Sequence, residues 1–206
     1  MASVLTEIIP TQAFEIVQNR IGAILLEEIT NQMSLQSLTD VFELYLERVE
    51  PYDKSEDVMI SVAFNSGDYD GYTQQDVQGE YMYFIDIFAK GAGVGTQTPS
   101  ENVRQKMFKY VGMARYILSS GKYPTLGLPP GVIGNRHIRK ITFDTDYSNF
   151  GNHSNFDGAF IRFCRIIYTV RVRESQLLWE GIPLYGNDSN LRPEGTEFGT
   201  RLIFNV

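Results

Sequence analysis

The sequence predicts an α+β fold, in which an antiparallel or mixed β-sheet carries two helices packed on one face. Two stretches with apolar residues every three or four positions predict the helices, and several stretches of alternating or β-branched residues predict the strands. Hydrophobic residues make up 43% of the 206 residues and charged residues 21%, a composition typical of folded globular proteins. We expect one α+β domain over residues 1–174, with long loops, and a C-terminal extension or arm over residues 175–206.

The two helices are expected over residues 11–32 and 101–120. Pro10 and Thr11 suit the beginning of the first helix, and Ser100 suits the beginning of the second. Gly121 is expected to end the second helix. The predicted buried stripe of the second helix consists of Val103, Met107, Ala114 and Ile117.

Strands are expected over residues 41–49, 58–64, 80–88, 138–143 and 159–173. The residues between them that are rich in Gly, Pro, Asp and Asn predict long loops over 65–79, 121–134 and 144–158. In the last strand, the alternation of side chains places one set on a single face, namely Phe160, Cys164, Ile166, Tyr168, Val170 and Val172.

The charge balance and the termini exclude several classes of protein. The 25 acidic residues outnumber the 18 basic ones, for a formal net charge of -7, which disfavours a broad nucleic-acid-binding surface. The N-terminal residues lack the pattern of a signal peptide, and no apolar run approaches the ~18 residues of a membrane helix. The single cysteine, Cys164, forms no intrachain disulfide and is expected to fill space in the core.

No catalytic, cofactor-binding or metal-binding motif is recognisable. His137 and His153 stand in no nucleophile or metal-binding motif, and glycine-rich residues 91–95 lack the Lys-Ser/Thr of a phosphate loop. The Asp-rich stretches at 68–76 and 144–157 could offer oxygen ligands to calcium, but neither has the closing Glu of a calcium loop. Turn chemistry accounts for the same residues, so we expect no metal and no cofactor.

An enzyme is the alternative from a different class of function. Catalytic carboxylates need no sequence motif, so a small-molecule site could be assembled by the fold from residues far apart in the chain. The candidates for such a site are Asp86, His137, Arg139 and Asp144.

Two groups of residues are candidates for contacts between subunits. Arg165, Arg171 and Arg173, together with Arg162, form a basic row in the last strand. This row is either a solvated, charge-protected strand face or the complement of an acidic patch on a neighbouring subunit. The strand-like residues 200–206 either add an edge strand to a neighbour or fold back on their own sheet. The apolar residues of this segment that are candidates for the subunit contact are Leu202, Ile203 and Phe204.

Four segments carry a resemblance to a known family: TQAFEIVQNRIGAILLEEI, VMISVAFNSGDYDGY with YMYFIDIFAKG, ENVRQKMFKYVGMARYILSS, and FIRFCRIIYTVRVRE. Their order over residues 11–174 resembles the tail terminator (tail completion or neck) proteins of long-tailed bacteriophages. The resemblance implies a virion protein, assembled in the host cytoplasm, that forms a hexameric ring on the tail tube and joins it to the head and neck. It also implies a lumen that passes DNA without binding it specifically, and no membrane partner. Another head-tail connector, neck or tail subunit is the alternative within this class.

Overall fold

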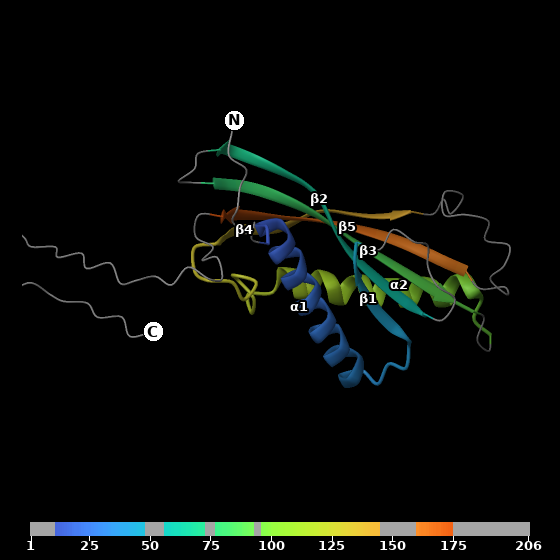
Figure 1. The fold of residues 1–206 in the computed structure, drawn as a ribbon. Helices are drawn as coiled ribbons and strands as arrows, with labels where there is room; N and C mark the ends of the chain where they lie inside the picture. The colour runs from blue at the N-terminus through green and yellow to red at the C-terminus, as the bar shows by residue number, and fades with distance from the viewer. Residues whose placement is uncertain (1–10, 48–55, 73–76, 93–95, 145–159, 175–206) are drawn as a thin grey trace, which may run out of the picture.

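The computed structural model describes residues 11–47, 56–72, 77–92, 96–144 and 160–174. In this part of the chain, a five-stranded sheet has the strand order β1-β2-β3-β5-β4, and helices α1 (Ala13–Leu35) and α2 (Pro99–Ser119) cover one of its faces (Figure 1). The strands are β1 (Phe42–Leu46), β2 (Val58–Tyr72), β3 (Val77–Gly91), β4 (Ile133–Asp144) and β5 (Phe160–Arg173). The predicted α+β class is confirmed, and the sheet is mixed because β1 runs parallel to β2 while the other pairs are antiparallel.

Strands β2 and β3 form an antiparallel hairpin, and both are longer than the strands predicted over residues 58–64 and 80–88. The expectation of a loop over residues 65–79 is wrong, because the ladder continues from the Ser66–Met82 pair to the Tyr72–Val77 pair. A bulge after Phe64 absorbs one extra residue of β2, so that the Gly- and Asp-rich sequence stays paired. Beyond the bulge, the ring of Tyr69 packs edge-on against that of Tyr81, with centroids 6.0 Å apart.

The remaining strands differ from expectation mainly at their ends. Strand β1 is shorter than the predicted 41–49, and it ends where Glu47 takes a positive φ of 54° and donates its backbone N–H to the Val62 carbonyl. Strand β4 begins at Ile133 rather than at Ile138, because two register shifts accommodate its polar first half. Strand β5 matches the prediction closely. The predicted loop at 144–158 and the arm at 175–206 lie outside the described residues.

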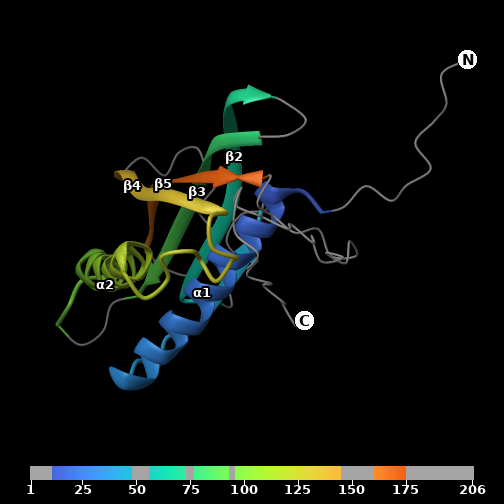
Figure 2. The same ribbon diagram turned by 90° about the vertical axis from the view of Figure 1, so that its left-hand side faces the viewer.

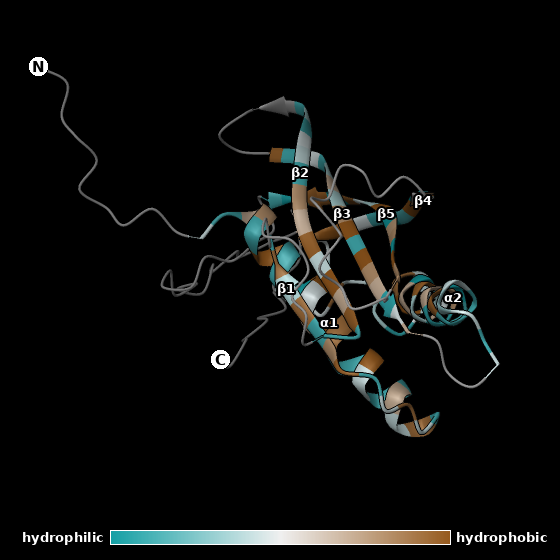
Figure 3. Ribbon diagram, turned by 90° about the vertical axis from the view of Figure 1, so that its right-hand side faces the viewer, coloured by the Kyte–Doolittle hydropathy of each residue, from teal (hydrophilic) through white to brown (hydrophobic). Residues whose placement is uncertain are grey.

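The hydrophobic core lies between the helices and the sheet. All four predicted positions of the α2 stripe are buried, as is one side of α1 from Ala13 to Ile29. The alternation of hydropathy along β3 and β5 is visible in Figure 3. The β5 residues predicted to share a face are buried in this core, with the exception of Phe160, which is 53% exposed at the beginning of the strand.

Helix α2 begins earlier than predicted, and contacts around its first turn hold it in place. Thr98, rather than Ser100, is the N-cap: its Oγ1 accepts the Glu101 backbone N–H at 3.3 Å, and the Glu101 carboxylate accepts the Thr98 N–H at 3.0 Å. This reciprocal capping box satisfies two backbone donors that the helix leaves unpaired. At the first turn, Gly91 of β3 comes so close to the helix that a Cβ there would lie 2.6 Å from the Val103 nitrogen.

The packing of α2 predicts the effect of a buried charge. Met107 is fully buried, so Met107→Asp places an unpaired carboxylate in the core and should lower the free energy of unfolding by about 3–5 kcal/mol. Gln105→Asp, at an exposed position of the same helix, should change it by less than about 1 kcal/mol. Urea denaturation of the two variants measures the difference, and equal effects would contradict the packing.

Candidate functional site

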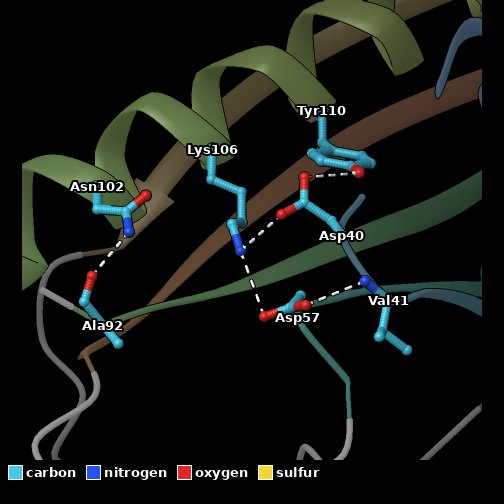
Figure 4. Close-up of polar contacts among 7 residues, drawn as sticks. All are labelled: Asp40, Val41, Asp57, Ala92, Asn102, Lys106 and Tyr110. Atoms are coloured by element: carbon cyan, nitrogen blue, oxygen red, sulfur yellow. Dashed lines mark hydrogen bonds and ion pairs between the residues drawn. The ribbon is translucent and has the colours of Figure 1, made fainter. Parts of the chain in front are cut away.

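A polar cluster joins α2 to the beginnings of β1 and β2 (Figure 4). The Lys106 Nζ lies 2.8 Å from Asp40 Oδ1 and 3.3 Å from Asp57 Oδ1. The Tyr110 hydroxyl donates to Asp40 Oδ2 at 3.1 Å, and Asp57 Oδ2 accepts the Val41 backbone N–H at 3.0 Å. Burial, reinforced by the nearby Asp40 carboxylate, raises the pKa of Tyr110, so the phenol remains a donor at neutral pH.

This cluster is best explained as structural. Each charged group in it has an opposite partner, and the cluster sits where a helix must be held against two strand ends. One turn earlier, Asn102 Nδ2 donates to the Ala92 carbonyl at 2.7 Å and ties the helix to the segment after β3. These contacts fix the rotation of α2 about its axis, and they therefore determine which side chains the helix presents on its outer face.

Removal of the central lysine tests this role. Lys106 is only 14% exposed, so Lys106→Met should leave the two aspartates facing each other without a counter-charge and destabilise the fold by about 1–3 kcal/mol. Lys140→Met is the matched control, because Lys140 is exposed on β4, lies outside both surface hollows that border α2 and forms no ion pair with the described residues. Thermal unfolding of both variants should show a drop in melting temperature for Lys106→Met alone.

The outer face of α2 and the second half of α1 border a groove of about 590 Å³. Its lining residues include Gln32 and Gln36 from α1, and Phe108, Gly112 and Tyr116 from α2. Phe108 is 50% exposed and Tyr116 is 78% exposed, although both are aromatic. Because large aromatic side chains in water are typical of protein–protein contacts, this groove is the candidate interaction site.

The charged groups of the groove differ in whether they have partners. Glu28 of α1 accepts hydrogen bonds from Lys122 and Tyr123, which lower the pKa of its carboxyl. Lys109, which lines the groove on α2, forms no ion pair with the described residues. The sequence alone does not reveal this site, because the exposure of Phe108 and Tyr116 depends on how α2 is rotated about its axis.

The basic row on β5 is largely neutralised within the chain. Arg165 makes two hydrogen bonds of 2.7 Å to the Asp86 carboxylate across the β3–β5 ladder. Arg171 pairs with Asp70 of the β2–β3 hairpin. Arg173 lies opposite Gln78 and is exposed. The two intrachain pairs account for Arg165 and Arg171 without a neighbouring subunit.

The guanidinium of Arg165 also stacks on aromatic rings of this face of the sheet. Its Cζ lies 4.3 Å from the Phe84 centroid and 5.6 Å from that of Phe163. The three other candidates for subunit contacts, Leu202, Ile203 and Phe204, lie outside the described residues.

The alternative catalytic residues do not converge. Asp86 lies opposite Arg165 in the register, whereas His137 lies opposite Thr169, so their positions are separated by about 13 Å along β5. Asp144 lies opposite Phe163, about 20 Å along the strand from His137. Arg139 lies between His137 and Asp144 in β4, where it is the extra residue at a bulge, and it is exposed. The four residues are spread along the sheet rather than gathered around one cavity.

His137 lines a separate hollow of about 540 Å³ beside the C-terminal end of α2. Arg136, one of two arginines that line this hollow, is already engaged: its guanidinium donates to the carbonyls of Leu118 and Ser120 and, at 3.2 Å, to the Tyr168 hydroxyl. Arg136 thus satisfies carbonyls that the helix end leaves unpaired, which is a structural role.

The described residues form no metal site, and the comparisons assign no family to the chain. Among the described residues, no group of three or more His, Cys, Asp or Glu side chains could hold a metal ion. In the same part of the chain, no helix is long and apolar enough to cross a membrane. Comparison with family models and with curated proteins found no match to this chain.

Proposed function

We propose that the chain is a virion structural protein, a phage tail terminator that forms a ring on the tail tube and joins it to the head and neck. The observation that carries the proposal is the exposed aromatic groove on α2, where Phe108 and Tyr116 project into water beside a cavity of about 590 Å³. A second subunit is the simplest cover for such a surface. The order of helix, hairpin, helix and long strand, on which the family resemblance rests, supports the same proposal.

The charge of the protein suits a ring that surrounds DNA. A closed ring requires a heterologous contact, in which one face of each subunit meets a different face of the next. A net charge of -7 keeps the walls of such a ring from binding phosphates, so a duplex passes through without being held. Another head-tail connector, neck or tail subunit would use the same kind of contact, and it remains the alternative proposal.

The oligomeric state tests the proposal directly. We expect the purified protein to form hexamers in multi-angle light scattering, at high concentration or after addition of tail tubes, because the aromatic groove is then covered. Deletion of residues 175–206 should weaken the association of subunits, with a smaller effect on the free energy of unfolding of the single chain. A protein that stays monomeric at high concentration and in the presence of tubes would contradict the ring.

Electron microscopy separates the terminator from the alternative. A terminator should bind the ends of isolated tail tubes and leave their sides bare. A head-side connector should instead decorate tailless heads and ignore the tubes.

A further inference from the structure

We propose that the α2 groove receives the tip of the β2–β3 hairpin from a second copy of this chain. The inference rests on the proposed ring and names the two surfaces that meet in it. The groove is defined by Phe108, Lys109, Gly112 and Tyr116 of α2. The hairpin tip is defined by residues 66–70 of β2 and 78–80 of β3.

Gly112 is the first observation that points to a partner. It lies in the middle of α2, where glycine costs about 1 kcal/mol relative to alanine. A Cβ added at Gly112 would meet no atom of the described residues within 4 Å, so this part of the fold has no need for glycine there. Gly91 is the contrast, because the neighbouring helix leaves no room for a side chain at that position. A missing side chain on an open helix surface suits the close approach of another backbone.

The surroundings of Gly112 form a notch between two aromatic rings. Phe108 and Tyr116 stand four residues before and after it, on the same row of the helix surface. Phe108 is held in place by an edge-on contact with Phe143 of β4, with ring centroids 5.3 Å apart. A strand edge or an aromatic side chain that enters this notch would therefore be flanked by apolar surface on both sides.

Charge complementarity selects the hairpin as the occupant. Lys109 lines the notch and forms no ion pair with the described residues, in a protein with a net charge of -7. The hairpin tip is acidic: Asp68 is exposed, and Asp70, although paired with Arg171, keeps 57% of its side chain exposed. Tyr69 is 43% exposed and lies on the opposite face of β2 from Asp68 and Asp70, so the tip carries acidic groups on one face and an aromatic ring on the other.

The edge of the hairpin is available for such a contact. Strand β1 pairs only with residues 58–62 of β2, and beyond that point no described strand pairs with the edge of β2 that faces away from β3. The hairpin tip points away from the helix layer, and α2 lies at the opposite side of the molecule (Figures 1 and 2). Two complementary surfaces on opposite sides of one chain make a heterologous contact, which is the type that closes into a ring.

Gly112→Ala separates stability from association. The substitution should raise the melting temperature of the unassembled chain by about 2–4 °C, because alanine favours the helix and the added methyl group meets no atom. It should weaken association by a factor of about ten, since the methyl group occupies the notch. Gly91→Ala should lower the melting temperature, and Gln105→Ala, exposed and outside the groove, should change neither property.

The outcomes of this measurement distinguish the two proposals. If the wild-type protein forms rings and Gly112→Ala forms them equally well, the docking site is wrong while the ring stands. If the wild-type protein does not associate under any condition, the proposed function fails as well.

Disulfide formation between copies identifies the occupant. Asp68→Cys and Lys109→Cys variants carrying different tags should form a mixed disulfide when combined under mild oxidation. Native Cys164 should give little background, because it is buried and burial raises the pKa of its thiol to about 12. Asn135→Cys, at an exposed position of β4 outside the groove, is the matched control and should not couple to Asp68→Cys. Coupling of Lys109→Cys to Leu202→Cys instead would overturn the hairpin and assign the groove to the C-terminal residues.

Discussion

The seating of α2 on strands β3 and β5 is the constraint on which the rest of the structure depends. At its first turn the helix comes so close to β3 that only glycine fits at residue 91. Further along, Lys106 and Tyr110 bind the two aspartates that begin β1 and β2. At its last turn, Arg136 of β4 binds the open carbonyls. Because the helix contacts four strands in this way, its position and its rotation are both determined.

The rotation of α2 has a functional consequence. It buries one side of the helix and presents Phe108, Gly112 and Tyr116 on the other, beside Lys109, which forms no ion pair with the described residues. The polar groups with strong partners are used to hold the fold together, as the Arg165–Asp86 pair shows. The groove combines exposed aromatic surface with a cation that has no ion-pair partner among the described residues, and the proposed assembly role rests on this combination.

Part of the candidate site could be anticipated from the sequence, and part could not. The basic row on β5 was visible as a pattern, but its neutralisation by Asp86 and Asp70 was not, because those partners come from other strands. The length of the hairpin was underestimated, since Gly and Asp residues that usually form turns are held in a bulged ladder by their cross-strand neighbours. The aromatic groove could not be predicted, because the sequence does not show whether Phe108 and Tyr116 lie on the buried or the exposed side of α2.

The sequence by itself determined the features that depend on local periodicity. These are the α+β class, the buried stripe of α2, the long final strand with its alternating faces, and the absence of a recognisable catalytic motif. Only the tertiary structure decided the parallel pairing of β1, the ion-pair partners of the arginines and the exposure of the helix notch. The physical reason is that periodicity reports which side of an element is apolar, whereas pairing and exposure depend on neighbours that are distant in the chain.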